Sequence, residues 1–195
     1  MIKKLLFFVY FLVSVSVVAQ ETYYNDVDLT KTGVALKTAL ATKITTTHTN
    51  ILDYTPEVWT ASKVTDQNPN NTNQIFLIYG WENGSDGDST NDKFRDKSLQ
   101  QSIGSNVGKW NREHIYARSL ATPRMPDTDN PGISTDAHNL RPSDSQRNEI
   151  RSNRKFAVGS ETASGNSSVS NGDGRQAWFP GDEWKGDVAR IVMYM

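Results

Sequence analysis

Trp110-Asn111-Arg112-Glu113-His114-Ile115-Tyr116 is the segment that says most about the fold and chemistry of this 195-residue chain. It reads as a strand that carries a carboxylate beside an imidazole. A second polar block, Asp136-Ala137-His138-Asn139-Leu140-Arg141-Pro142, contains another short strand at residues 139–141. Ser143-Asp144-Ser145 then supplies capping side chains for a helix from Gln146 to Phe156. These patterns predict two strands and a helix that crosses them.

The rest of the chain shows weaker signals for short elements. Apolar residues at near-helical spacing predict a helix over Asp28–Asn50. Thr55-Pro56-Glu57 begins a second, short helix, since a capping residue is followed by Pro. The apolar run Gln74–Tyr79 predicts a buried strand, and residues 186–195 predict a helix with one apolar face.

Two polar stretches, residues 80–97 and 159–174, read as loops. In the first, acidic residues alternate from Asp86 as they do at the start of a calcium-binding loop. Its sixth position is Asn91 instead of Gly, however, and its twelfth is Lys97 instead of Glu. An EF-hand is therefore excluded.

Residues 1–20 have the features of a cleavable export signal. Two lysines precede an apolar run of 15 residues, from Leu5 to Ala19, which ends in small side chains suited to signal peptidase. A membrane anchor is the other interpretation, but a spanning helix needs about 20 apolar residues. We expect a mature domain over residues 21–195, secreted or periplasmic, with no stable membrane association.

Composition limits the chemistry available. The chain is long enough for one domain with its own core, and it has no cysteine, which excludes a cysteine nucleophile and thiolate zinc sites. Loss of Lys3 and Lys4 with the signal would change the formal charge from −1 to −3. Residues 109–155 nevertheless hold nine Lys or Arg against six acids, and local charge governs phosphate contact more than the total does.

The central motifs suit metal-assisted hydrolysis of a phosphodiester. His114 is a candidate base because its ordinary pKa lets it accept a proton near neutrality. Glu113 and Asn148 offer hard oxygen ligands for Mg²⁺, and Ca²⁺ or Mn²⁺ are alternatives. Glu113 and His114 point to opposite faces of an ideal strand, so if both serve one site the strand must end or bulge there, or one residue must act through a water. Candidate phosphate-binding cations, each equally consistent with a structural salt bridge, are Arg118, Arg141 and Arg151.

These motifs resemble the bacterial endonuclease I family, secreted or periplasmic nucleases with a ββα-metal finger. The resemblance rests on residues 110–119, 136–142 and 148–153. Weaker matches are Leu29–Lys37, Asn68–Asn71 and Lys185–Arg190. It implies an α+β fold, mainly helical with a small antiparallel sheet.

The resemblance also implies a role for each candidate residue. His114 would be the general base, Glu113 and Asn148 would hold one Mg²⁺, and Asn139 would help to orient His114. One of the three arginines would stabilise the scissile phosphate. Such enzymes cut DNA, and often RNA, with little sequence preference and leave 5′-phosphate ends. We expect a monomer.

The sequence departs from the family pattern at Ala117, where many relatives have Pro, and in its lack of cysteine. Relatives continue beyond the final helix, so we expect the chain to be truncated at its C-terminus. Two other functions stay open: a noncatalytic exported module that binds nucleic acid or polysaccharide, and a metal-dependent hydrolase of other phosphate esters.

Overall fold

A computed structural model describes residues 21–160 and 166–195 of the chain. Its contacts define two units, residues 1–50 and 51–195. The described part of the first unit contains α2 (Glu21–Tyr24) and α3 (Gly33–Thr47). The signal predicted for residues 1–20 lies outside the described residues. None of the described helices combines the length and apolar character needed to cross a membrane.

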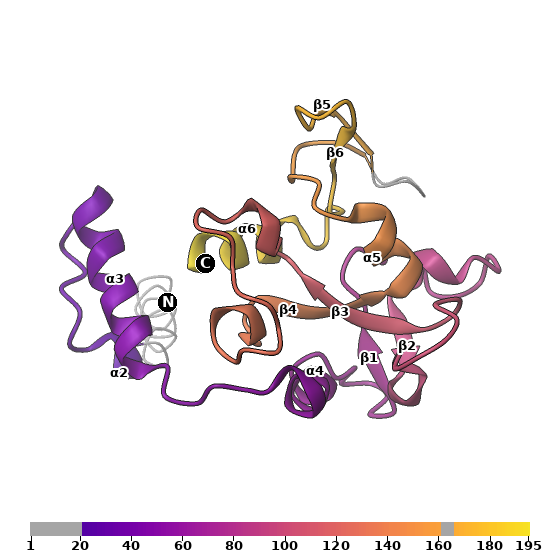
Figure 1. The fold of residues 1–195 in the computed structure, drawn as a ribbon, viewed down its shortest axis with the longest axis horizontal. Helices are drawn as coiled ribbons and strands as arrows, with labels where there is room; N and C mark the ends of the chain where they lie inside the picture. Colours follow the sequence, from indigo (N-terminus) through magenta and orange to yellow (C-terminus); the bar gives the residue numbers. More distant parts are fainter. Residues whose placement is uncertain (1–20, 161–165) are drawn as a thin grey trace, which may run out of the picture. The chain divides into compact units, whose positions relative to one another are not determined.

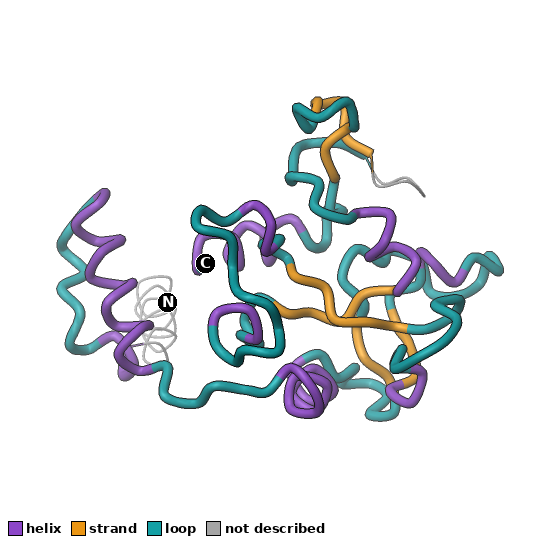
Figure 2. The backbone as a smooth tube through the Cα atoms, viewed as in Figure 1, coloured by secondary structure: helices purple, strands orange, loops and turns teal. Residues whose placement is uncertain are grey.

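Short elements joined by long loops make up the second unit (Figures 1 and 2). A turn at Tyr54–Val58, in which Thr55 has an extended backbone, leads into α4 (Trp59–Thr65), and two further α-helices follow, α5 (Ser145–Arg151) and α6 (Lys185–Tyr194). The described strands form three separate antiparallel pairs. These pairs are β1 (Gln74–Phe76) with β2 (Phe94–Asp96), β3 (Trp110–His114) with β4 (Leu140–Asp144), and β5 (Asn166–Ser170) with β6 (Gln176–Trp178). The predicted α+β class is confirmed.

The run that begins at β1 contributes to two hydrophobic clusters. Ile75 and Leu77 pack in one cluster with Trp59 and Trp110. The second cluster contains Ile78, Tyr79, Ile115, Trp178, Trp184 and Val188. Alternate residues of an extended segment point to opposite sides, so one short apolar run can serve both clusters. The second cluster brings the segment after β3 against β6 and α6.

Several elements are shorter than the sequence predicts. The strand predicted over residues 74–79 ends at Phe76, and the backbone leaves the extended conformation at Tyr79, where φ is 72°. The helix predicted to reach Phe156 ends at Arg151, because Ser152 has a φ of 54°. The two predicted loops contain strands: β2 lies within residues 80–97, and β5 within residues 159–174.

Candidate active site

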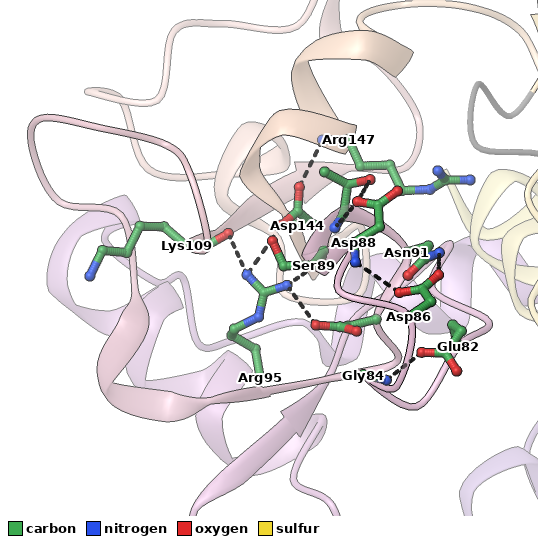
Figure 3. Close-up of polar contacts among 12 residues, drawn as sticks. Glu82, Gly84, Asp86, Asp88, Ser89, Asn91, Arg95, Lys109, Asp144 and Arg147 are labelled. Carbon is green, nitrogen blue, oxygen red and sulfur yellow. Dashed lines mark hydrogen bonds and ion pairs between the residues drawn. The ribbon is translucent and has the colours of Figure 1, made fainter.

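The N-terminus of α5 is anchored by Asp144, as the sequence predicts for a capping residue. Its Oδ1 accepts a hydrogen bond from the backbone N–H of Arg147 at 3.0 Å. Its Oδ2 lies 3.2 Å from Nη1 of Arg95, and both side chains are buried. Figure 3 shows Arg95 reaching from β2 to Asp144 and to the backbone carbonyl of Lys109, which precedes β3. One ion pair therefore ties the helix to two strand pairs.

The strands β3 and β4 and helix α5 form one ββα unit. The register pairs Glu113 with Arg141 and His114 with Leu140. Helix α5 lies against β3 (Figure 1). Nδ2 of Asn148 donates to the carbonyl of Arg112 at 3.3 Å. One helical turn later, the guanidinium of Arg151 donates to the carbonyls of His114 and Ile115, at 2.7 and 2.8 Å. The helix thereby fixes the backbone on both sides of Glu113.

Glu113 is a buried carboxylate with one oxygen held by the protein. Its Oε1 accepts hydrogen bonds from Nη1 of Arg151 at 2.7 Å and from the hydroxyl of Tyr79 at 3.0 Å. No side chain of the described residues donates to Oε2. Burial raises the pKa of Glu113, while the charge of Arg151 and the Tyr79 hydroxyl oppose that shift. The carboxylate is thus fixed through Oε1, and the backbone N–H of His114 is a further hydrogen-bond partner that opposes the rise in its pKa.

His114 is the last residue of β3 and is paired with Leu140, one register position after Glu113, so the ladder has no bulge between the two residues. Its Nε2 lies 2.8 Å from the carbonyl oxygen of Ser134, which can only accept a hydrogen bond. The Nε2 therefore carries the proton, and Nδ1 of the neutral ring is an acceptor. The ring of Tyr54 stacks beside the imidazole at 6.1 Å. Burial lowers the pKa of His114 to about 4, and the nearby charge of Arg118 adds to this effect. At neutral pH the imidazole is uncharged.

The donor set fits a magnesium site with few protein ligands. Oε2 of Glu113 has no side-chain donor among the described residues, and the amide of Asn148 uses Nδ2 toward the protein, so Oε2 and Oδ1 are the hard oxygens that would hold the ion. Within the described ranges, no three acidic or histidine side chains are grouped to hold a metal. Mg²⁺ does not require such a group, since it commonly keeps several waters and takes one or two carboxylates.

The three candidate arginines have different surroundings. Arg151 is buried, and its guanidinium is bonded to Glu113 and to backbone carbonyls. Arg141 is paired with the buried Asp66, with Nε 2.6 Å from Oδ1. Both guanidinium groups are thus held by protein partners, which disfavours phosphate contact.

Arg118 is placed differently. Its Nε donates to the carbonyl of Pro126 at 2.9 Å, and its Nη2 pairs with Asp127, whose side chain is 77% exposed. The carbonyl of Pro126 also accepts from the hydroxyl of Ser134, the residue that binds His114. Arg118 therefore lies close to the candidate base, with a partner that solvent reaches.

Asn139 is fully buried and its side chain serves the backbone. Its Oδ1 accepts from the N–H of Tyr116 at 2.7 Å, and its Nδ2 donates to the carbonyl of the same residue at 3.1 Å. The side chain of Asn139 fixes the segment after His114, and the imidazole donates its hydrogen bond to the carbonyl of Ser134.

Comparison with known proteins places this arrangement in a family. The family model described as Endonuclease I matches residues 32–195. The chain belongs to the endonuclease I family. It is 41% identical over 179 residues to the extracellular ribonuclease of Bacillus subtilis (strain 168), and 41% identical over 176 residues to the extracellular ribonuclease of Bacillus amyloliquefaciens. Each alignment covers 90% of this chain and 52% of the relative, so the chain spans about half the length of these relatives. No solved structure matches it.

Sequence reasoning missed three residues of this candidate site, namely Ser134, Tyr79 and Tyr54. Ser134 contributes a backbone carbonyl, which leaves no side-chain signal. Tyr79 stands at the end of an apolar run and reads as one more core residue of a strand. Tyr54 comes from a segment 60 positions before His114 in the sequence, and no local motif marks it.

Proposed function

We propose that this endonuclease I chain is an exported nuclease that hydrolyses phosphodiester bonds in DNA and RNA without sequence preference and depends on Mg²⁺. Family membership and the names of the two extracellular ribonucleases support this proposal. The observation that supports it most is the end of β3, where Nδ1 of His114 is an acceptor, no described side chain donates to Oε2 of Glu113, and Asn148 bonds to the same strand.

His114 would act as the general base. Its neutral ring accepts a proton at Nδ1 from the attacking water, while the carbonyl of Ser134 holds the Nε2 proton and stabilises the imidazolium that forms. Arg118 would contact a nonbridging phosphate oxygen in exchange for Asp127, because guanidinium binds carboxylate and phosphate with the same geometry.

Glu113 and Asn148 would hold the metal through Oε2 and Oδ1. Bound Mg²⁺ supplies positive charge to the phosphate and to the departing 3′ oxygen. The buried Arg151 keeps Glu113 oriented and keeps the carbonyl of His114 in place, so it acts on the reaction by positioning.

A water nucleophile activated by His114 also predicts which ends cleavage leaves on RNA. If water is the nucleophile, the ribose 2′-hydroxyl takes no part, and DNA and RNA give the same kind of ends. Cleavage then leaves 5′-phosphate and 3′-hydroxyl groups on both. Attack by the 2′-hydroxyl would instead leave a 2′,3′-cyclic phosphate on RNA.

The test is cleavage of supercoiled plasmid and of a structured RNA by the purified protein, with Mg²⁺ or with EDTA. Wild-type protein should cut both with Mg²⁺ alone, and His114→Ala should lose cleavage by about 10²-fold or more while its fold is retained. End analysis should find 5′-phosphates on both substrates. Cleavage by His114→Ala at the wild-type rate would exclude this base, and shifted but uncut nucleic acid would favour a binding module.

A further inference from the structure

Tyr79 has a backbone conformation that a tyrosine rarely adopts. Its φ is 72°, and Ser152 is the other non-glycine residue with a positive φ in the described ranges. Left-handed backbone is unfavourable for a residue with a Cβ atom, because the Cβ atom crowds the following carbonyl oxygen. Such strain persists only where the surroundings hold the residue in place, and it is a reason to examine what the side chain does.

The surroundings of Tyr79 determine its position closely. Just before it, the N–H of Ile78 donates to the carbonyl of Pro142 in β4 at 2.8 Å. Just after it, the carbonyl of Gly80 accepts from Nε1 of Trp184 at 2.7 Å. Gly80 itself must be glycine, because a Cβ atom there would lie 2.1 Å from the carbonyl oxygen of Asp92. The turn is therefore tied on both sides to distant elements.

The side chain of Tyr79 crosses the core to reach the site. The residue is 1% exposed, and its ring packs edge to face on Trp178 at 5.5 Å. Its hydroxyl donates to Oε1 of Glu113, the same oxygen that Arg151 binds. Two donors from different elements thus converge on one carboxylate oxygen. A carboxylate held in this way cannot rotate to exchange Oε1 for Oε2.

We propose that the strained turn at Tyr79 exists to position Glu113, so that the hydroxyl of Tyr79, together with Arg151, fixes Oε1 and presents Oε2 to the metal. This inference rests on the proposed metal-dependent function. Tyr79 acts through Glu113 and is a positioning residue. A phenylalanine ring at position 79 would fill the same volume in the core and would lack only the hydroxyl donor, so this substitution isolates the contact with Glu113.

Tyr79→Phe tests this role, with Tyr194→Phe as a matched control. The hydroxyl of Tyr194 also donates to a carboxylate at 3.0 Å, but its acceptor is Asp136. Calorimetric titration with Mn²⁺ measures metal affinity without turnover. The binding that is lost in Glu113→Ala is the binding that depends on the Glu113 carboxylate. We expect Tyr79→Phe to weaken Mn²⁺ binding about tenfold, as loss of an outer partner of a metal ligand typically does. Tyr194→Phe should bind as wild type does.

Nuclease kinetics give a second readout. In Tyr79→Phe the Mg²⁺ concentration for half-maximal cleavage should rise about tenfold, while the rate at saturating Mg²⁺ stays within about twofold of wild type. A purely structural role of Tyr79 would not raise the Mg²⁺ concentration for half-maximal cleavage while leaving the rate at saturating Mg²⁺ unchanged. Equal Mn²⁺ affinity in Tyr79→Phe and wild type would overturn the inference. Failure of Tyr79→Phe to fold would overturn it as well, because the hydroxyl would then serve the fold.

The outcomes separate this inference from the proposed function. If wild type binds Mn²⁺ through Glu113 but cleaves nothing, the proposed function fails while the positioning role of Tyr79 stands on the affinity data. If wild type cleaves but Tyr79→Phe binds Mn²⁺ normally, the positioning role alone fails. Absence of Mn²⁺ binding by wild type would overturn the inference.

Discussion

The pKa of His114 should lie below the ordinary value for histidine and the pKa of His138 above it, and a pH titration measures both shifts. Burial lowers the pKa of His114 from 6.5 to about 4. The hydrogen bond from Nδ1 of His138 to Asp136, 2.9 Å long, raises the pKa of His138. At pH 5.5 an imidazole with a pKa of about 4 is about 97% neutral, whereas one with a pKa of 6.5 is about 9% neutral.

Imidazole nitrogen NMR on the metal-free protein measures both values, and the chain has three histidines to assign. His114→Gln identifies the His114 signals. We expect its ring to stay neutral down to about pH 5, with the proton on Nε2, where the carbonyl of Ser134 accepts it. A midpoint near 6.5 would refute the lowered pKa of His114. A proton on Nδ1 would refute the assignment of Nδ1 as the proton acceptor.

The same shift predicts the pH dependence of stability. A folded-state pKa below the unfolded one means that the unfolded chain takes up the proton first as pH falls. The contribution of His114 is therefore complete above pH 6.5 and is lost between 6.5 and about 4, by roughly 3 kcal/mol. Urea unfolding of wild type and His114→Gln at pH 7 and pH 4.5 isolates this difference, and parallel pH curves would contradict it.

Two substitutions test the framework and the phosphate contact. Asp144→Ala should destabilise the fold by about 2–4 kcal/mol in urea unfolding, because it removes a helix cap and leaves the buried Arg95 with the more distant Asp92 as its remaining ion-pair partner. Asp182→Ala, which breaks an exposed ion pair, should change stability by less than about 1 kcal/mol, and equal effects would argue against this account. Arg118→Ala should lower kcat/KM for nucleic acid about 10–100-fold with little change in the free energy of unfolding. Asp127→Ala should not lower kcat/KM. An unchanged kcat/KM in Arg118→Ala would contradict the proposed contact with phosphate.

The local parts of the site could be predicted from the sequence because local rules produce them. A polar strand, a capping aspartate and a short helix place Glu113, His114 and Asn148, and the structure has these elements within a few residues of the expected bounds. The cap at Asp144 follows from side-chain chemistry next to the helix.

Long-range contacts explain what the sequence could not show. The three candidate arginines are alike in sequence, and they differ by what they meet. Arg141 meets Asp66, 75 positions away, and Arg118 meets Asp127 in an exposed loop. The turn at Tyr79 was equally hidden, since its neighbours are apolar and continue the strand pattern. A positive φ there depends on Trp184 and Pro142, which no local window contains.

Because successive residues of a strand point to opposite faces, the two adjacent site residues of β3 are supported by different parts of the chain. Glu113 is held by Tyr79 and Arg151, and His114 by the turn at Ser134. The proton acceptor can therefore be removed without disturbing the groups that hold the carboxylate. A His114→Ala protein should remain a competent receptor for uncut strands, which makes it the form in which an intact complex of nucleic acid and metal can be captured and its structure determined.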